Sequence, residues 1–491
     1  MQKVVSRLGL TRVLVGSIAV LLILGSWWGV GRMNDGLVTR RFKQDGVPLT
    51  FISPAEGRDL PGIVLAHGFG GSQQLMLGYG LGFARAGYAV MLLNFSGHAS
   101  NPNPLSTSRD ALQDDLDTAL QALTAQPEVN PNKVALLGHS MGSGAVMQAG
   151  IEHPDRYAAV IAVSPTSAEV SDSTPPNLML QVGAWETRFL ANAQELLAEA
   201  GGATEGFAEK RARRLVVIPN AQHITILFSA KSREMAADWL SSSFGVEREL
   251  NFTDTRMTWY GMHLLGWLMI ALAFGPLAGM RSDAYPAQPE AGRRWLGLLL
   301  APFVATGFLS LLAGWADLSG FLGLQVGGAL AIWFFVMGMV WLVAAVRTNP
   351  PRRQNLLWGG LLFALIWVAM GLIAQFTWMQ WFLITPRLWR WPILALACLP
   401  WKLALGHALQ RAKGWRRAGL WAIQSVVLLV SLLMVASWIP GMFVIMLIAP
   451  VLLIVLGVEI LISRHVDDPW VYAIGSALFF GWVIVGFFPI A

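Results

Sequence analysis

The nine residues VALLGHSMG, from Val134 to Gly142, indicate the fold of the surrounding chain. An apolar run ends at Gly138, and residues 140–152 have the composition of a helix. A short apolar run that passes through glycine into a helix is typical of a buried strand, a sharp turn and a helix. Glycine is expected at both ends of the turn because neighbouring backbone passes close to it. The turn would raise the hydroxyl of Ser140 above the end of the strand.

Short apolar runs alternate with helical stretches on both sides of this motif, between about Asp35 and Gly245. Such alternation predicts a doubly wound, mostly parallel α/β domain over residues 35–246. The first two runs flank Gln44-Asp45-Gly46, which predicts a hairpin. The expected strands are Leu37–Arg41, Val47–Ile52, Gly62–Ala66, Ala89–Asn94, Val134–Leu137, Ala158–Val163, Leu178–Val182 and Leu215–Ile218. The expected helices are Gln73–Ala86, Arg109–Thr124, Ser140–Glu152, Phe189–Ala200 and Ala230–Ser242.

The remainder of the chain has the composition of a membrane protein. Hydrophobic residues make up 55% of the 491 residues and charged residues only 13%, about half the usual share. The apolar run Val13–Val30 follows three basic residues and predicts an anchor over residues 1–34; cleavage near Gly29 is the alternative. Residues 257–491 contain eight further runs long enough to span a bilayer. They are Met257–Met280, Trp295–Trp315, Phe321–Val346, Leu356–Phe376, Pro392–Leu409, Leu420–Trp438, Met442–Ile462 and Trp470–Pro489.

The distribution of basic residues predicts the orientation of these nine spans. Lys and Arg gather in alternate loops, and such loops are usually cytoplasmic. We therefore expect the N-terminus inside, with the α/β domain and the C-terminus outside, as in a multi-pass protein of a bacterial inner (plasma) membrane. The loop residues are Arg281, Arg293, Arg294, Arg347, Arg352, Arg353, Arg411, Lys413, Arg416, Arg417 and Arg464. This placement of the net charge of +6 also argues against a nucleic-acid surface.

Four charged residues require separate comment. Arg387 and Arg390 break the alternation, and they lie in the segment Pro386–Pro392, which we interpret as a surface or re-entrant segment. Lys402 and Glu459 lie inside apolar runs toward predicted cytoplasmic ends. Long side chains there can extend to the membrane surface, so we expect both to do so.

Ser140 needs a base to accept its proton before it can act as a nucleophile. His223 follows the last predicted strand, and the carboxylate that would orient it is Glu186, after the strand Leu178–Val182. Asp172 is the alternative acid. Without catalysis, His223 would be an ordinary loop histidine and Glu186 a helix-capping residue. The N–H groups of Met141 and of Phe69, in the glycine-rich loop His67–Gly71, are candidates to stabilise an oxyanion.

These motifs resemble the α/β-hydrolase family, and within it the dienelactone-hydrolase-like and esterase/lipase-like branch. The resemblance covers about Leu37 to Phe244 and rests on His67–Gly71, Asn94–Ser100, Gly138–Gly142, Gly183–Glu186 and His223. It implies hydrolysis of an ester or related acyl bond through an acyl-serine, without metal or cofactor. Two positions depart from the family: aspartate is common where Asn94 stands, and usual where Glu186 stands. The short connection from Val163 to Leu178 leaves no room for a large lid.

The sequence thus predicts a membrane-bound serine hydrolase that acts on a small or lipid-like acyl substrate at the extracytoplasmic face. Two alternatives remain open. An alcohol in place of water would make the same residues an acyltransferase. In the second alternative, the chain is a transport or scaffold protein whose hydrolase-like domain only binds a ligand or partner. The identity of the substrate and of any protein partner does not follow from the sequence.

Overall fold

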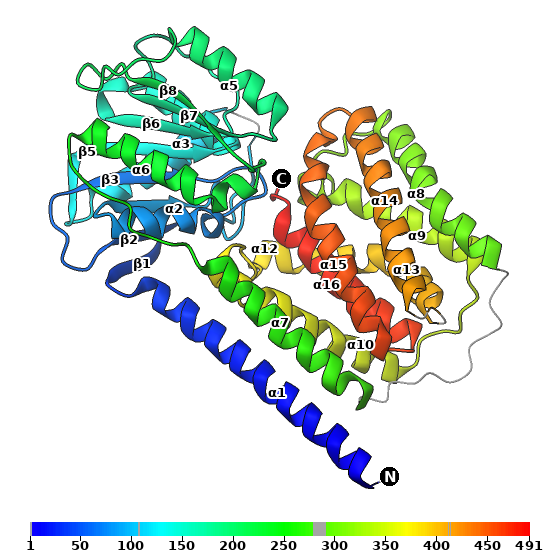
Figure 1. The fold of residues 1–491 in the computed structure, drawn as a ribbon. Coiled ribbons are helices and arrows are strands. Elements are labelled where there is room, and N and C mark those ends of the chain that lie inside the picture. Colours follow the sequence, from blue (N-terminus) through cyan, green and yellow to red (C-terminus); the bar gives the residue numbers. More distant parts are fainter. Residues whose placement is uncertain (1, 107–108, 278–290, 411, 413) are drawn as a thin grey trace. The chain divides into compact units, whose positions relative to one another are not determined.

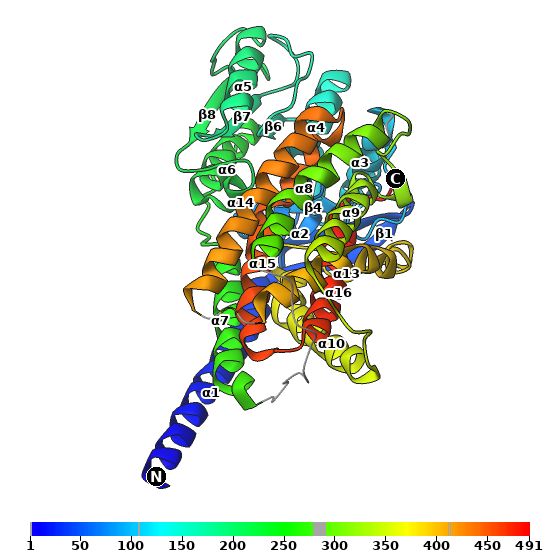
Figure 2. The ribbon, with the colours of Figure 1, turned by 90° about the vertical axis from the view of Figure 1, so that its right-hand side faces the viewer.

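The computed structural model describes residues 2–106, 109–277, 291–410, 412 and 414–491. It divides into two compact units. One unit, which we call the sheet unit, comprises Ser26–Gly261 together with Ala374–Phe382. The other, the helical unit, contains the remaining helices. Each is described separately below, and Figures 1 and 2 show the elements of both.

An eight-stranded sheet forms the centre of the sheet unit, with the strand order β1-β2-β4-β3-β5-β6-β7-β8. The first three strands in this order pair antiparallel, and the remaining neighbours are parallel. Asp45 and Gly46, both with positive φ, close the predicted hairpin as a two-residue turn. The strands are β1 Leu37–Gln44, β2 Val47–Pro54, β3 Leu60–Ala66, β4 Ala89–Leu93, β5 Val129–His139, β6 Ala159–Val163, β7 Leu178–Gly183 and β8 Arg213–Ile218.

Helices cover both faces of this sheet. The helices α3 Arg109–Thr124, α4 Met141–Glu152 and α5 Thr187–Glu199 share one apolar core with the strands. The helices α2 Gln73–Arg85 and α6 Ala230–Phe244 contact each other and pack on the strands. Because the central strands are buried on both faces, their sequences are continuous apolar runs, as a parallel sheet requires.

Strand β5 is longer than the sequence predicts. The apolar run predicted a strand from Val134, but pairing begins at Val129. Val129 and Asn130 lie beside Leu60 and Pro61 of β3, and the register shifts after Pro61. The polar residues 130–133 gave no strand signal, so tertiary pairing determines the start of this element.

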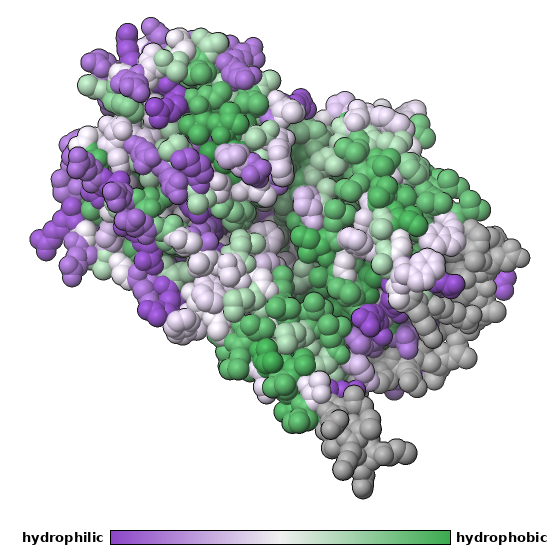
Figure 3. Space-filling model, in the orientation of Figure 1, coloured by the Kyte–Doolittle hydropathy of each residue, from purple (hydrophilic) through white to green (hydrophobic). Residues whose placement is uncertain are grey.

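Nine helices of the described chain are long and apolar enough to cross a membrane, in agreement with the nine predicted runs. Green, hydrophobic residues dominate much of the helical unit's visible surface in Figure 3, whereas hydrophilic residues are frequent on the sheet unit. Two of these nine spans each contain two α-helices, α10 with α11 and α12 with α13, so the α-helices involved are α1 Gln2–Gly31, α7 Arg256–Phe274, α8 Ala291–Ala313, α9 Gly327–Ala345, α10 Arg353–Ile366, α11 Ala374–Thr377, α12 Thr385–Leu388, α13 Arg390–Leu409, α14 Trp415–Trp438, α15 Ala449–Ile462 and α16 Pro469–Phe487.

The structure corrects two expectations about charged residues in the helical unit. Lys402 and Glu459 do not reach the surface, because their side chains are 0% exposed and Lys402 Nζ donates to Glu459 Oε2 at 2.5 Å. Arg387 and Arg390 are buried rather than on a surface segment. Arg387 donates to the carbonyl of Phe488, and Arg390 donates to that of Leu322. Neighbouring backbone and an opposite charge thus satisfy groups that would otherwise have to reach water.

Several residues used to predict orientation lie outside this description. Arg281, Arg411 and Lys413 fall outside the described residues, and so do the side chains of Arg293 and Arg294.

Candidate active site

Ser140 lies on a sharp turn between β5 and α4. Its φ of 52° and ψ of −119° are unusual for a residue other than glycine, and its N–H donates to the carbonyl of Val163 at 2.9 Å. A Cβ on Gly138 would lie 2.1 Å from the Gly142 carbonyl oxygen, and one on Gly142 would lie 2.6 Å from two carbonyl oxygens of β3 and its loop. Both predicted glycines are therefore required by close backbone contacts.

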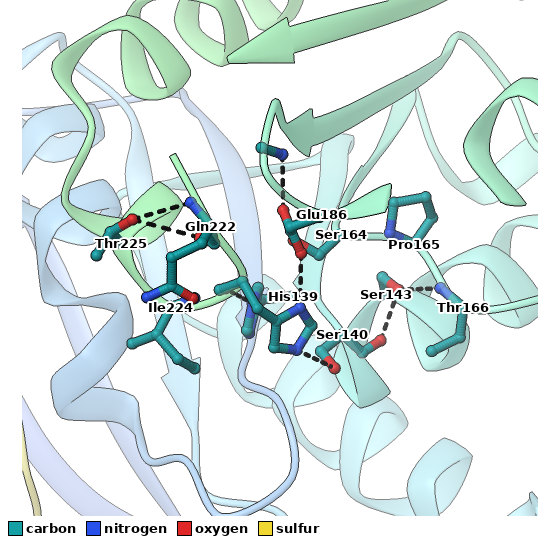
Figure 4. Close-up of polar contacts among 12 residues, drawn as sticks. His139, Ser140, Ser143, Ser164, Pro165, Thr166, Glu186, Gln222, Ile224 and Thr225 are labelled. Atoms are coloured by element: carbon teal, nitrogen blue, oxygen red, sulfur yellow. Dashed lines mark hydrogen bonds and ion pairs between the residues drawn. The ribbon is translucent and has the colours of Figure 1, made fainter. Parts of the chain in front are cut away.

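Three predicted residues form a continuous hydrogen-bonded chain at this turn (Figure 4). His223 Nε2 lies 3.0 Å from Ser140 Oγ, and His223 Nδ1 lies 2.7 Å from Glu186 Oε1. The His223 side chain is 19% exposed, whereas that of Glu186 is only 2% exposed. The base can thus meet a ligand on the Ser140 side, while the carboxylate is shielded from water.

Glu186 is held by contacts that the sequence did not reveal. Its Oε2 accepts a hydrogen bond from the Gly183 N–H at 2.6 Å and another from Ser164 Oγ at 3.0 Å. A Cβ on Gly183 would lie only 2.9 Å from this oxygen. Ser164 directly follows β6, the neighbour of β7 in the sheet, and this position was the available signal for its role. With Oε2 fixed, Oε1 is left to orient the imidazole.

Two aromatic contacts fix His223. The ring of Phe189 stacks on the imidazole with the centroids 4.4 Å apart, and the His139 ring lies 4.9 Å away. His139 Nε2 also lies 2.8 Å from the carbonyl oxygen of His223. Burial, and then the nearby charge of His223, hold the pKa of His139 well below its ordinary value. A neutral His139 can donate to this carbonyl without adding a second positive charge beside the base.

The alternative acid, Asp172, lies elsewhere. It is an exposed loop residue whose Cβ is near Gly201. Its negative charge acts on Arg213, at the start of β8, where it opposes the lowering of the Arg213 pKa by burial. His223 follows the opposite end of β8. The structure therefore brings Glu186, and not Asp172, to the imidazole.

The glycine-rich loop after β3 passes beside Ser140. A Cβ on Gly68 would lie 3.0 Å from the Ser140 Cβ. His67 fixes the loop: its Nδ1 bonds the Gly68 carbonyl at 2.8 Å, and its Nε2 accepts from the Phe95 N–H at 3.1 Å. Burial lowers the pKa of His67 to about 4, so the ring is neutral at pH 7, as this pair of bonds requires. Phe69, the predicted oxyanion donor, follows in this loop.

The described residues contain no group of three or more histidine, cysteine, aspartate or glutamate side chains arranged to hold a metal ion. Cys398, the single cysteine, is buried in α13. Within the part of the chain that the structure covers, the candidate active site is therefore the hydrogen-bonded group of Ser140, His223 and Glu186.

Comparison with known proteins finds relatives for part of the chain. Residues 61–222 match the family described as Hydrolase_4, serine aminopeptidase S33. The quorum-quenching protein AidA of Acinetobacter baumannii is 31% identical over 121 residues, which are 24% of this chain and 39% of that protein. An uncharacterized protein of Mycobacterium tuberculosis is 25% identical over 124 residues, 25% of this chain and 43% of that protein. The chain thus spans about two fifths of the length of these curated relatives.

Solved structures of other proteins also match part of the chain. Dienelactone hydrolase from Anabaena variabilis is 19% identical, covers 42% of this chain and 97% of its own, and has a TM-score of 0.31. A dienelactone hydrolase-like promiscuous phosphotriesterase from metagenomic libraries is 15% identical, covers 43% of this chain and 100% of its own, and has a TM-score of 0.35.

Proposed function

Because the sheet unit of this chain is an α/β hydrolase, joined to many long apolar helices, we propose that the protein is a membrane-bound serine hydrolase acting on an ester or related acyl bond. The observation that carries the proposal is the hydrogen-bonded chain from Ser140 through His223 to Glu186. A serine, an imidazole and a carboxylate in this order are the parts that acyl transfer needs.

In the proposed reaction, Ser140 Oγ attacks the carbonyl carbon of the substrate while His223 Nε2 takes the hydroxyl proton. The resulting oxyanion accepts hydrogen bonds from the Phe69 and Met141 N–H groups. His223 then gives its proton to the leaving alcohol, and the acyl-serine remains. Glu186 stays ionised throughout and stabilises the imidazolium that forms in each half-reaction.

Water then attacks the acyl-serine as His223 removes one of its protons, and the carboxylic acid leaves with Ser140 restored. An alcohol in the place of this water would give acyl transfer by the same steps. We propose hydrolysis because Ser140 and His223 are both partly exposed, so water can reach them, and the segment 164–177 contains no helix that would form a lid. A small or lipid-like acyl substrate suits such an open site.

We propose further that an anchor (residues 1–34) and a membrane domain (residues 257–491) hold the hydrolase domain (residues 35–246) at the extracytoplasmic face. The distribution of basic residues is the basis for the choice of face, and three span ends support a common side for the ends that adjoin the hydrolase domain. They are the end of α1, the start of α7 and the end of the span at residues 353–377. Within the sheet unit, Trp27 contacts Phe376 and Arg256 donates to the Thr377 carbonyl. Two span ends in contact must lie on the same side of the membrane. The chain between them must therefore cross the membrane an even number of times, as the proposed topology requires.

Labelling with a fluorophosphonate tests the proposed activity, because this probe reacts only with an activated serine. Membranes containing the wild-type protein should label, and the Ser140→Ala and His223→Ala variants should not. Ser173→Ala removes an exposed loop serine and should label like the wild type. A folded wild-type protein that does not label would instead favour the transport or scaffold alternative.

A further inference from the structure

Two cavities lie against the β1–β2 hairpin, at the edge of the sheet remote in strand order from β8. The more polar of the two has a volume of about 350 Å³ and walls of mixed polar and apolar residues; the other has a volume of about 330 Å³ and largely apolar walls. Arg41, Thr50, Leu77 and Phe376 line both. We call the pair the edge groove. All of its lining residues belong to the sheet unit, and it includes neither Ser140, His223 nor Glu186.

The polar cavity presents two positive charges that no carboxylate neutralises. Alternation along β1 places Arg40 on one face, where it pairs with Glu128, and directs Arg41 and Lys43 to the other. In the described part of the chain, neither Arg41 nor Lys43 has an ion pair or a side-chain hydrogen bond. Two like charges two residues apart on one strand face repel each other, so an anion bound between them would relieve that repulsion.

The same cavity offers hydrogen-bond acceptors. Gln74 is only 7% exposed, and its Nε2 donates to Gln380 Oε1 at 2.8 Å. This bond fixes the carboxamide, and Gln74 Oε1 is buried without a partner among the described residues, as is Gln73 Oε1. A buried acceptor without a donor is unfavourable, so both oxygens favour a ligand with hydroxyl groups beside its negative charge.

The apolar cavity lies where two candidate spans end. Trp27, Val30 and Met33 come from the end of the first span, and Phe376 comes from the end of the span at residues 353–377. The rings of Trp27 and Phe376 meet edge to face at 5.7 Å. Leu77 and Leu81 of α2 complete the wall. This half of the groove suits a hydrocarbon chain, and its position at span ends is where lipid chains and headgroups meet.

We propose that the edge groove binds an anionic glycerophospholipid. The headgroup phosphate lies between Arg41 and Lys43. Alcohol groups of the headgroup donate hydrogen bonds to the side-chain oxygens of Gln73 and Gln74. One acyl chain lies against Leu81 and Phe376. A free anion would leave the apolar cavity unused, and a neutral lipid would leave both cations unpaired. The two volumes together are in the range of ordinary small-molecule sites, roughly 300–1,000 Å³.

Photocrosslinking of the full-length protein tests this site. The purified protein is placed in phosphatidylcholine vesicles that contain a small fraction of phosphatidylglycerol with a photoreactive diazirine in one acyl chain. Crosslinks should map to peptides containing Trp27, Leu77–Leu81 and Phe376. Unlabelled phosphatidylglycerol should compete, phosphatidic acid should compete less well because its headgroup lacks hydroxyls, and inorganic phosphate should not compete.

A matched pair of variants separates the groove from general attraction to a charged membrane. Arg41→Glu with Lys43→Glu should reduce crosslinking at these peptides by at least about tenfold, since each basic residue contributes about a fivefold preference for anionic lipid. Arg58→Glu with Lys133→Glu makes the same change in charge at exposed residues outside the groove and should leave crosslinking unchanged. Thermal unfolding checks that both variants fold.

Three outcomes would overturn the proposal. If the folded Arg41→Glu, Lys43→Glu protein crosslinks as strongly as the wild type, Arg41 and Lys43 do not bind the lipid. Equal crosslinking by a photoreactive phosphatidylcholine would exclude selection for an anion, and displacement by inorganic phosphate would show a free-anion site instead. Fluorophosphonate labelling is read separately, so loss of the serine activity does not affect this result.

Discussion

Glu186 stands where related domains usually have aspartate, and its contacts explain how a longer side chain fits. The extra methylene carries the carboxylate back toward β7, where Gly183 N–H and Ser164 Oγ hold Oε2. A larger residue at 183 would occupy this space, since its Cβ would approach Oε2 to 2.9 Å. The glutamate and the glycine three residues before it therefore form one arrangement, and the identity of the acid depends on both.

Substitution of the acid distinguishes the two candidates that the sequence left open. Glu186→Gln keeps the size of the side chain but removes the charge that stabilises the imidazolium, so ester hydrolysis should slow by about 10³- to 10⁴-fold. Asp172→Asn removes an exposed carboxylate and should leave the rate unchanged. Rates with a chromogenic short-chain ester measure both; the reverse pattern would assign the acid to Asp172.

At the scale of elements, helix α2 connects the glycine-rich loop to the edge groove, and Asn94 fixes its start. Asn94 Oδ1 accepts the Gln73 N–H at 2.8 Å, its Nδ2 donates to Ser100 Oγ at 2.9 Å, and its carbonyl accepts from Asn101. This residue departs from the family's usual aspartate, yet its Oδ1 still caps the helix. Its amide adds a donor that a carboxylate would lack.

Removal of this cap should destabilise the protein measurably. Asn94→Ala leaves the first N–H of α2 without its acceptor, and we expect a loss of about 1–2 kcal/mol in the free energy of unfolding. Asn94→Asp retains the acceptor for the Gln73 N–H, and Ser100 Oγ can donate to its carboxylate, so this variant should lose less stability than Asn94→Ala. Thermal unfolding in detergent gives both values. Asn132→Ala, at an exposed position of β5, serves as the control; equal stability of Asn94→Ala and Asn132→Ala would show that the cap is unimportant.

The elements of this fold follow from local sequence, whereas their pairing does not. Buried parallel strands such as β3 and β6 are continuous apolar runs, so the sequence located them. Nothing local indicates that β4 lies between β2 and β3, or that β5 begins at Val129, since both depend on hydrogen bonds to distant residues. The motif likewise predicted Ser140, and the position after the last strand predicted His223. Ser164 and Phe189 were missed because they contact Glu186 and His223, which are distant in sequence. The partnership of Lys402 with Glu459 was missed because they lie on different helices.

At the scale of the whole molecule, buried neutral histidines make stability depend on pH. The pKa of His67 falls from 6.5 to about 4 in the folded protein, so between these values the unfolded chain binds more protons than the native one. Stability should therefore decline as the pH falls from about 6.5 to 4, by about 3 kcal/mol for this residue. The lowered pKa of His139 acts in the same direction.

Thermal unfolding as a function of pH measures this dependence. His67→Gln can keep one donor and one acceptor while it removes the titrating ring, so its stability should change less steeply between pH 6.5 and 4. The same slope in both proteins would show that protonation of other groups controls acid unfolding.

The proposed orientation predicts which residues a membrane-impermeant reagent reaches. Cys398→Ala gives a background without cysteine. In that background, Lys133→Cys places a thiol on the hydrolase domain, and a maleimide that cannot cross membranes should label it in intact cells. Arg353→Cys, at the first residue of α10, should label only after the membrane is permeabilised. The opposite result would place the hydrolase domain in the cytoplasm.

The segment Ala374–Phe382 is part of the sheet unit, although more than a hundred residues separate it from the rest of that unit in sequence. It supplies Gln380 to Gln74 and the Thr377 carbonyl to Arg256. A single truncation of the chain therefore cannot isolate the complete sheet unit. A recombinant fragment ending near residue 255 would leave Gln74 without Gln380 and expose the apolar surface that Phe376 covers. Circular permutation or a grafted peptide corresponding to residues 374–382 would be the rational route to a minimal soluble enzyme.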